Sequence, residues 1–371
     1  MKVGVITMHK VINYGSVLQA YATQEIVRKL GYECEIIDYD FPNSWQFSRG
    51  ISQNRLSLKS RISKALHIRK AYDKEPKLLR FIHNHLLLSK EFKSVEDLQA
   101  DPPLYDVYMT GSDQVWNYNF TKGDPTFFLS FAPADRPKIA FSSSFAVDSI
   151  PKEQRTEISE RLKTYSSISV RETRGQAIVK DLIGRDVPVT LDPTLVLDRE
   201  DWNKLIKTSK KKEEYIFLYM LDYAYNPAPY IYDLVRYVQE CKGLIVYSNI
   251  EIPKSLGISY HSVAGAGIEE FIQLIRDSSL VITSSFHGVS FAVNFGVPLM
   301  AVVPQETRSD TRLTSLLEKL ALHNSIIKKN TPFEALSFGE YDEEREQMLL
   351  SKLRNESTYY LRKAINTPQT K

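Results

Sequence analysis

The chain has 371 residues, of which 43% are hydrophobic and 25% are charged, and its formal net charge is +3. This composition is typical of a globular protein, and one hydrophobic core stops growing near about 250–300 residues, so we expect two domains. The small net charge does not indicate nucleic-acid binding. Cys34 and Cys241 stand alone, which gives no indication of a disulfide or a zinc site. The opening MKVGVITMHK contains no signal-peptide core, so we expect a cytoplasmic protein.

The first forty residues have a β–loop–α–β pattern. A short apolar strand at 2–7 is followed by a polar loop at 8–16, which contains Asn13, Tyr14 and Gly15. Ser16 is predicted to cap a helix that runs to about Leu30, and a second strand follows at 34–38. This resembles half of a Rossmann-type domain, but it lacks the G-x-G-x-x-G run of dinucleotide sites. No dinucleotide cofactor is therefore indicated.

The segment from about 41 to 100 differs from its surroundings. Residues 51–72 contain six basic and no acidic side chains on a predicted helix. A solvated helical face is the default interpretation. The alternative is a peripheral contact with anionic membrane lipid or with an acceptor that carries a diphosphate.

Three further predicted strands of the first domain each end in a polar loop. The strand at 105–110 leads to Ser112, Asp113 and Gln114, the strand at 138–142 leads to a run of serines, and the strand at 168–170 leads to Arg171. Open α/β sheets bind ligands at the carboxyl ends of their strands, so these loops are candidate binding elements. Asp113 is alternatively an Asx turn that caps a helix, Arg171 an ion-pair partner of Glu172, and Asp192-Pro193 a turn at the domain edge.

The charged stretch 207–214 is predicted to link the first domain, 1–206, to a second domain at 207–340. The second domain is expected to alternate strands and helices, with strands at 215–221 and 244–247 and helices at 230–241, 268–277 and 313–322. A final helix, at about 341–365, is expected to pack back on the first domain.

The stretch 280–303 has the pattern of a βαβ unit. An apolar run is followed by the hydroxyls of Thr283, Ser284 and Ser285, which can cap a helix over 286–295. Gly296 and Pro298 end this helix, and a second apolar strand follows. His287 falls in the first turn, beside backbone N–H groups and the positive end of the helix dipole, where an anion can bind. A packed core histidine is the competing interpretation.

Several of these loops together resemble the polysaccharide pyruvyl transferase family. The resemblance is carried by Asn13-Tyr14-Gly15 with the following LQAYATQ, by GSDQVWN at 111–117, SVRE at 169–172, LDPT at 191–194, and SSFHG at 284–288 followed by GVP at 296–298. It implies an α/β protein with two Rossmann-like domains facing a cleft, as in GT-B glycosyltransferases. It also implies transfer of the enolpyruvyl group of phosphoenolpyruvate onto sugar hydroxyls as a pyruvate ketal, in cell-surface polysaccharide biosynthesis.

The resemblance assigns expected roles to residues of this chain. His287 would protonate the methylene carbon of the donor, and Asp113 would act on the acceptor hydroxyl. Arginine suits a carboxylate and a phosphate because its fork binds both in a bidentate way, which favours Arg171, Arg308 and Arg312, with Lys10 behind them. The predicted substrate-binding set is Asn13, Tyr14, Gly15, Ser112, Gln114, Arg171, Ser284, Ser285, Phe286, Gly288, Arg308 and Arg312.

The chain departs from the family pattern at one motif, because many relatives carry Arg-Leu-His where it has Ser285-Phe286-His287. Two other functions therefore remain open: a glycosyltransferase that uses a nucleotide-sugar, and a catalytically silent glycan-binding member of a polysaccharide assembly complex. We expect no metal and no cofactor, and a sugar or lipid-linked glycan as acceptor at the inner face of the membrane. The sequence does not specify the acceptor sugar or the oligomeric state.

Overall fold

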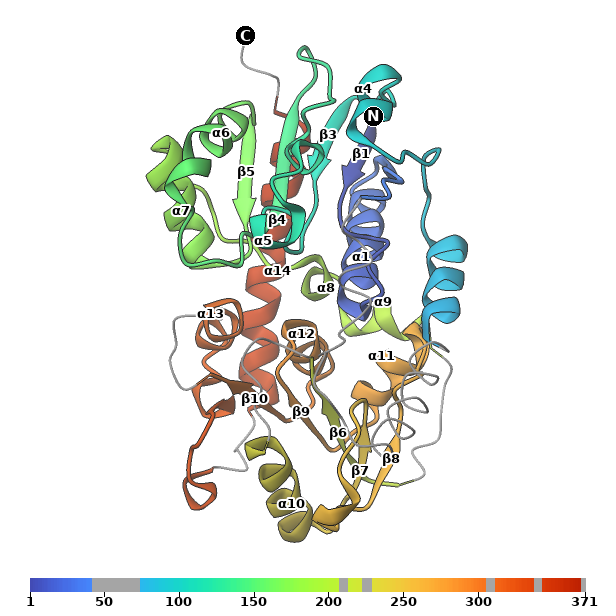
Figure 1. Cartoon of the computed structure of the whole chain (residues 1–371), viewed down its shortest axis with the longest axis vertical. Helices are drawn as coiled ribbons and strands as arrows, with labels where there is room; N and C mark the ends of the chain where they lie inside the picture. The colour runs from blue at the N-terminus through green and yellow to red at the C-terminus, as the bar shows by residue number, and fades with distance from the viewer. Residues whose placement is uncertain (42–73, 207–212, 222–228, 305–310, 337–341, 368–371) are drawn as a thin grey trace. The chain divides into compact units, whose positions relative to one another are not determined.

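The computed structural model describes residues 1–41, 74–206, 213–221, 229–304, 311–336 and 342–367 (Figure 1). The chain forms two compact units. The described residues within 1–41, 81–197 and 350–367 belong to the first unit, and those within 74–80 and 198–349 belong to the second. Both the basic segment 51–72 and most of the predicted linker at 207–214 lie outside the described residues.

The described part of the first unit contains a parallel sheet with the strand order β2-β1-β3-β4-β5. The chain moves from β1 outward to β2 and then returns to the other side of β1, so the direction of winding reverses between β1 and β3. Ligands bind at such a reversal, beyond the carboxyl ends of the strands. The strands are β1 (Lys2–Ile6), β2 (Glu33–Ile36), β3 (Val107–Thr110), β4 (Lys138–Ser143) and β5 (Ser167–Val170).

Helices cover both faces of this sheet, and the alternation of side chains along β4 shows why. Ala140 packs in an aromatic-rich core together with residues of α6 and α7, whereas the ring of the next residue, Phe141, stacks on Tyr360 of α14. Because β4 is buried on both faces, its consecutive residues Ile139, Ala140 and Phe141 are all apolar. The helices of this unit are α1 (Tyr14–Lys29), α4 (Val95–Ala100), α5 (Tyr118–Thr121), α6 (Lys152–Lys163), α7 (Thr173–Ile183), α8 (Pro193–Val196) and the 3-10 turn η1 (Pro125–Phe128), with a further helix at 74–85 that begins in the second unit.

The described part of the second unit contains a parallel sheet with the order β11-β10-β9-β6-β7-β8. Counted from its own first strand, this is the 3-2-1-4-5-6 order of the Rossmann fold, and the winding reverses between β6 and β9. The strands are β6 (Tyr215–Tyr219), β7 (Ile245–Ser248), β8 (Tyr260–Ser262), β9 (Leu280–Thr283), β10 (Leu299–Val303) and β11 (Ile326–Lys328).

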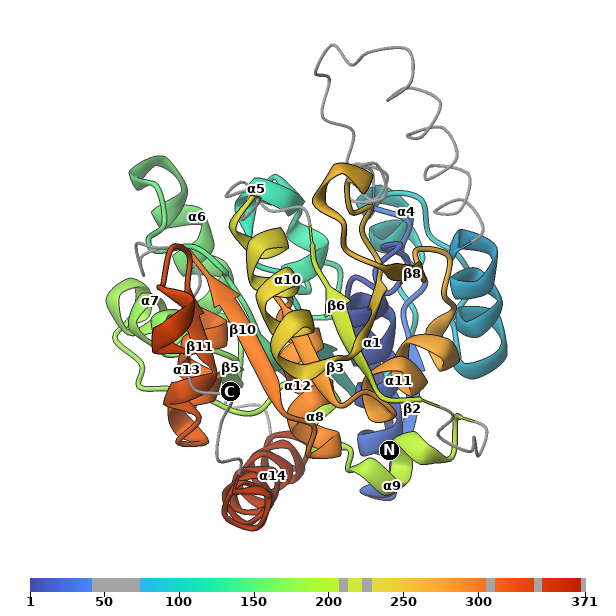
Figure 2. The same ribbon diagram turned by 90° about the horizontal axis from the view of Figure 1, so that it is seen from below.

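The helices α10 and α11 lie on different sides of β6 (Figure 2), and alternate residues of the strand pack against each of them. Ile216 and Leu218 pack with the apolar side chains of α10, and Phe217 and Tyr219 contact Phe271 of α11 on the other face. Because Phe271 also contacts Phe291 of α12, α11 and α12 share that face. The helical segments of this unit are α9 (Arg199–Asn203), α10 (Tyr230–Lys242), η2 (Lys254–Leu256), α11 (Ile268–Arg276), α12 (Phe286–Phe295), α13 (Thr311–Lys319), η3 (His323–Ser325) and η4 (Phe333–Ala335).

The last helix, α14 (Glu343–Ile365), is the red helix of Figure 1. Its residues from Leu350 onward belong to the first unit, and its earlier residues belong to the second. In the first unit, the Ser357 hydroxyl oxygen accepts a hydrogen bond from the backbone N–H of Leu191 at 2.9 Å. The Tyr360 hydroxyl donates to the carbonyl oxygen of Ala140 at 3.0 Å.

One predicted helix start was wrong. Asn13, not Ser16, is the N-cap of α1: its side-chain oxygen accepts from the backbone N–H of Gly15 at 2.8 Å. Tyr14 and Gly15 therefore lie in the first turn of α1 instead of in the preceding loop. Both Asn and Ser are good caps, and the sequence alone does not choose between two capping residues three positions apart.

Candidate active site

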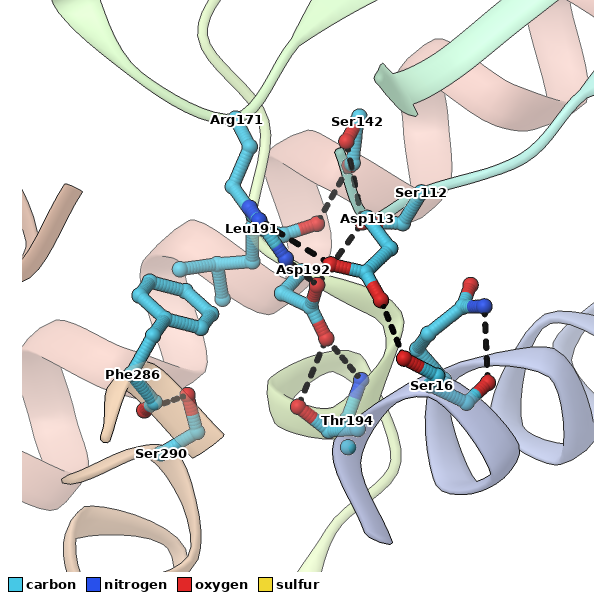
Figure 3. Close-up of polar contacts among 12 residues, drawn as sticks. Ser16, Ser112, Asp113, Ser142, Arg171, Leu191, Asp192, Thr194, Phe286 and Ser290 are labelled. Atoms are coloured by element: carbon cyan, nitrogen blue, oxygen red, sulfur yellow. Dashed lines mark hydrogen bonds and ion pairs between the residues drawn. The ribbon is translucent and has the colours of Figure 1, made fainter. Parts of the chain in front are cut away.

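The first candidate region lies where the first sheet reverses its winding, at the ends of β1 and β3. Ser16, in the first turns of α1, donates a hydrogen bond from its hydroxyl to Oδ2 of Asp113 at 2.7 Å (Figure 3). Asp113 follows β3, so this hydrogen bond joins the start of α1 to the loop after β3. Ser16, which was not among the predicted binding residues, thus contacts the predicted catalytic residue Asp113 at the place where this fold class binds ligands.

Asp113 occupies an unusual backbone position. Its φ is +74°, in the left-handed region that favours glycine, and Ser142 at the end of the neighbouring strand has a φ of +53°. The carbonyl oxygen of Asp113 accepts from the backbone N–H of Ser144 at 3.0 Å, which fixes the turn. The next helix, α5, is capped by Asn117 and not by Asp113. Strained backbone of this kind concentrates at functional sites.

Arg171 leaves the end of β5 and is buried, with only 1% of its side chain exposed. Its Nη1 donates to Oδ2 of Asp192 at 2.8 Å, and its Nη2 lies 3.6 Å from Oδ1 of Asp113 (Figure 3). The ion pair considered from the sequence was with Glu172, but the carboxylate of Glu172 instead accepts from the backbone N–H groups of Phe145 and Ala146. The guanidinium is thus shared between two buried aspartates.

Asp192 organises this region, although the sequence indicated only a turn. Its Oδ2 accepts from Ser112 at 2.7 Å in addition to Arg171, and its Oδ1 accepts from the backbone N–H and the hydroxyl of Thr194. Asp192 is therefore the N-cap of α8, with Pro193 at the first helical position. An Asp-Pro pair before a short apolar run is the local signal that could have indicated this cap.

The other predicted residues of the first unit make local contacts. The Ser112 hydroxyl also lies 2.9 Å from the carbonyl oxygen of Ser142, and the Gln114 side-chain oxygen accepts from Asn117 at 2.8 Å. Tyr14 is buried. Trp116 of the GSDQVWN motif is 1% exposed and packs among Phe128, Phe145 and Tyr165 in the core.

The second candidate region lies at the winding reversal of the second sheet. Ser285 is the N-cap of α12, and its hydroxyl accepts from the backbone N–H of Gly288 at 3.3 Å, as the sequence predicted for this hydroxyl run. The Ser284 hydroxyl accepts from the backbone N–H of Leu221, which follows β6. Ser284 thus joins the loops after β6 and β9, whereas in the first unit the Ser16–Asp113 hydrogen bond joins α1 to the loop after β3.

His287 lies in the first turn of α12 and is 7% exposed. Its ring is perpendicular to that of Phe286, with the ring centroids 5.3 Å apart. The carbonyl oxygen of Phe286 accepts from the Ser290 hydroxyl at 2.9 Å (Figure 3). The first N–H groups of an α-helix have no acceptor within the helix, and the helix dipole is positive there. An imidazole in this turn is suited to an anionic ligand.

Of the two arginines predicted to bind the donor from the second unit, only Arg312 lies within the described residues. Arg312 lies in α13 and is buried, with 8% of its surface exposed. Arg308 lies outside the described residues.

Within the described residues, no group of three or more His, Cys, Asp or Glu side chains is placed to hold a metal ion. None of the described helices has the length and apolar character needed to cross a membrane.

A charged cluster at the ends of β1 and β2 was missed from the sequence, apart from Lys10. Oδ1 of Asp38 lies 3.0 Å from Nε2 of the fully buried His9 and 2.8 Å from Nζ of Lys10, which also contacts Glu91 at 2.8 Å. Burial alone would raise the pKa of Asp38, but the hydrogen bonds from His9 and Lys10 hold it below its usual range. The pKa of Lys10 is raised: burial opposes its charge, and its bonds to Asp38 and Glu91 outweigh that effect.

Three solved structures illustrate what this chain is similar to. A putative UDP-N-acetylglucosamine 2-epimerase from Listeria monocytogenes has 12% identity and a TM-score of 0.50, with 95% of this chain and 90% of that chain covered. A UDP-GlcNAc 2-epimerase from Methanocaldococcus jannaschii has 12% identity and a TM-score of 0.46, with coverages of 96% and 93%. A glycosyltransferase from a Streptomyces species has 12% identity and a TM-score of 0.42, with coverages of 97% and 96%.

The predicted fold class is therefore confirmed: the chain is an α/β protein with two parallel, Rossmann-like sheets and a GT-B-like fold. No curated protein matches the chain. A family model described as polysaccharide pyruvyl transferase matches residues 13–306. Because this match covers most of the chain, the protein belongs to the polysaccharide pyruvyl transferase family.

Proposed function

We propose that this protein transfers the enolpyruvyl group of phosphoenolpyruvate to two hydroxyls of a sugar or lipid-linked glycan, forming a pyruvate ketal in polysaccharide biosynthesis. The observation that carries the proposal is the placement of His287 in the first turn of α12, where the second sheet reverses its winding. Membership of the family supports transfer onto a glycan.

The start of α12 is the proposed donor-binding region. Phosphoenolpyruvate carries a carboxylate and a phosphate, and helix N-termini favour anions because of their N–H groups and dipole. Ser284, Ser285 and Gly288 are proposed to bind the donor here, together with Phe286 and the cations Arg308 and Arg312. With Ser285 in place of the Arg of many relatives, the helix terminus and these arginines would supply the positive potential.

The proposed reaction balances with the side chains available. Protonated His287 donates its proton to the methylene carbon of the donor, which becomes a methyl group and leaves a cationic C2. One sugar hydroxyl attacks C2 and gives its proton to Asp113. The C–O bond to phosphate then breaks, the second hydroxyl attacks the same carbon, and its proton leaves with the phosphate. The proton on Asp113 replaces the one that His287 gave, so each turnover converts donor and diol into ketal and inorganic phosphate.

Purified protein incubated with phosphoenolpyruvate and a panel of galactosides, glucosides and mannosamine derivatives tests the proposal. The expected result is phosphate release and a product whose mass exceeds that of the acceptor by one pyruvic acid less one water. His287→Ala should lower kcat by about 100-fold or more, the typical contribution of a general acid. His323→Ala, which removes an exposed histidine of the same unit, is the matched control and should retain full activity.

Other outcomes would contradict the proposal in different ways. Full activity of His287→Ala would remove the proposed acid. Release of a nucleotide from a nucleotide-sugar, without use of phosphoenolpyruvate, would identify a glycosyltransferase instead. Binding of glycan without turnover of any acceptor would identify a silent binding protein.

A further inference from the structure

Asp192 is the most completely enclosed acidic side chain of the first unit's site, and no role is assigned to it by the proposed reaction. None of its side-chain surface is exposed, and each carboxylate oxygen accepts two hydrogen bonds. A buried carboxylate persists only when it is paired and hydrogen-bonded, because desolvation opposes its charge. Through these hydrogen bonds Asp192 fixes the positions of Ser112 and Arg171.

Asp192 lies in a buried group with one arginine and a second aspartate. Asp113, Arg171 and Asp192 have side chains that are 9%, 1% and 0% exposed, and they comprise two carboxylates and one guanidinium. Among these three side chains two carboxylates therefore share one guanidinium, an arrangement better suited to a neutral polyhydroxyl than to an anionic donor. Arg171, predicted from the sequence to bind substrate, already has its charge balanced by Asp192 and Asp113.

The two contacts of Arg171 are unequal. Nη1 forms a hydrogen bond of 2.8 Å with Asp192, whereas Nη2 lies 3.6 Å from Oδ1 of Asp113, which is an ion pair without a short hydrogen bond. The other oxygen of Asp113, Oδ2, is occupied by the hydroxyl of Ser16. Among the described residues Oδ1 of Asp113 has no hydrogen-bond donor, so it can accept one from a substrate hydroxyl.

We infer that Asp192 is a positioning residue: it holds Arg171 so that the guanidinium stabilises the charge of Asp113 without occupying Oδ1. Oδ1 then accepts the proton of the sugar hydroxyl. Asp192 also fixes Ser112, the residue before Asp113, through the Ser112 hydroxyl at 2.7 Å. The inference rests on the proposed function, because it assigns the first unit's site to the acceptor hydroxyls.

The variant Asp192→Asn tests this role. An amide holds the guanidinium more weakly than a carboxylate does, so Arg171 should move onto Oδ1 of Asp113 and compete with the acceptor. We expect kcat to fall by about 100-fold while KM for phosphoenolpyruvate stays within about twofold. The acid limb of the kcat–pH profile should move to lower pH, because Asp113 gains a closer cation and loses a neighbouring negative charge.

The matched control is Thr194→Ala, which removes a hydrogen bond to Oδ1 of Asp192 and leaves Oδ2, the oxygen that binds Arg171, untouched. It should lower the thermal midpoint slightly and leave kcat and the pH profile unchanged. If Asp192→Asn shows the wild-type kcat and pH profile, or if Thr194→Ala reproduces its kinetic defect, Asp192 is only a helix cap and the inference is wrong.

Two further outcomes are decided by the same assays. If Asp192→Asn does not fold, Arg171→Lys provides the test: an ammonium cannot span both carboxylates as the guanidinium does, so the same loss of kcat at constant KM is expected, and wild-type kinetics would overturn the inference. If the wild-type protein does not turn over phosphoenolpyruvate, the proposed function fails and the inference fails with it. Wild-type turnover with an unaffected Asp192→Asn refutes the inference alone.

Discussion

Gly288 shows how one residue shapes the start of α12. A Cβ atom built at this position would lie 2.5 Å from Oγ1 of Thr283 and 3.0 Å from Cδ1 of Tyr219. Oγ1 of Thr283 cannot easily move away, because it accepts from the backbone N–H of Ser285 and donates to the carbonyl oxygen of Tyr219. The glycine of the SSFHG motif is therefore needed for close packing of α12 against β6 and β9.

Gly288→Ala should lower the free energy of unfolding by about 1–3 kcal/mol, the usual cost of overpacking a well-packed core. Urea unfolding of the wild type, Gly288→Ala, Thr283→Ala and the double variant measures it. Because Thr283→Ala removes Oγ1, the glycine substitution should cost less in that background, and the cycle should show coupling of about 0.5 kcal/mol or more. Purely additive effects would show that the contact with Thr283 is not the cause.

At the level of residues, the sequence predicted those features that are determined by adjacent residues in the chain. The capping hydroxyl of Ser285 and the place of His287 in the first turn follow from a few adjacent residues. The role of Asp192 could not be predicted in the same way, since its partners Ser112 and Arg171 are 80 and 21 residues away. The positive φ of Asp113 is set by bonds to the neighbouring strand, which the sequence does not identify.

At the level of elements, Asp38 connects the loops that follow β1 and β2. Its carboxylate binds His9 and Lys10, which both lie in the loop after β1. Its side chain is 12% exposed, so water screens these contacts only in part. The contacts help to hold the loop that leads into α1.

The stability supplied by Asp38 should depend on pH. Its pKa is lowered in the folded protein, so its contribution is fully present above the unfolded value of about 3.9 and is lost as the pH falls through the folded value. Asp38→Asn should lower the free energy of unfolding by about 2 kcal/mol at pH 7, typical of a hydrogen bond to a charged group.

The difference between wild type and Asp38→Asn should shrink as the pH falls below about 4. Urea unfolding at several pH values measures it. A difference that is constant with pH would show that the charge of Asp38 is not the stabilising feature. Asp148→Asn, at a half-exposed aspartate with one long ion pair of 4.0 Å, is the control and should have little effect at any pH.

Most of the long helices and strands could be predicted, but two of the shortest strands could not. The bounds of α12 and β10 agree with the prediction because Ser285 and the C-cap Gly296 are local signals at both ends of the helix. The strands β8 and β11, of three residues each, were not predicted. They form through pairing with β7 and β10, and that pairing is decided by the tertiary structure.

At the scale of the whole molecule, α14 completes the core of the first unit. Leu361, Ala364 and Ile365 are buried, and Arg354 donates from Nε to the carbonyl oxygen of Leu195 at 2.7 Å. Each buried large apolar side chain contributes about 2 kcal/mol, and each hydrogen bond contributes about 1 kcal/mol. The first unit therefore depends on residues that follow the second unit in sequence.

A chain that ends at Leu349 should lose the cooperative unfolding of its first unit. Without residues 350–367, Phe141 and its neighbours on that face of the sheet lose their cover. Hydrogen exchange followed by mass spectrometry should show rapid exchange in β1, β3 and β4 while β6 and β9 remain protected. A chain that ends at residue 367 is the control and should behave as the full chain. Full protection of β4 in the shorter chain would contradict the expectation.

The split composition of the first unit has a consequence during translation. Roughly 150 residues, 198–349, separate its main part from the segment that finishes it. At about 5–20 residues per second, the ribosome takes on the order of ten to thirty seconds to add them. For that time the nascent polypeptide displays an uncovered apolar sheet, which is a natural substrate for chaperones.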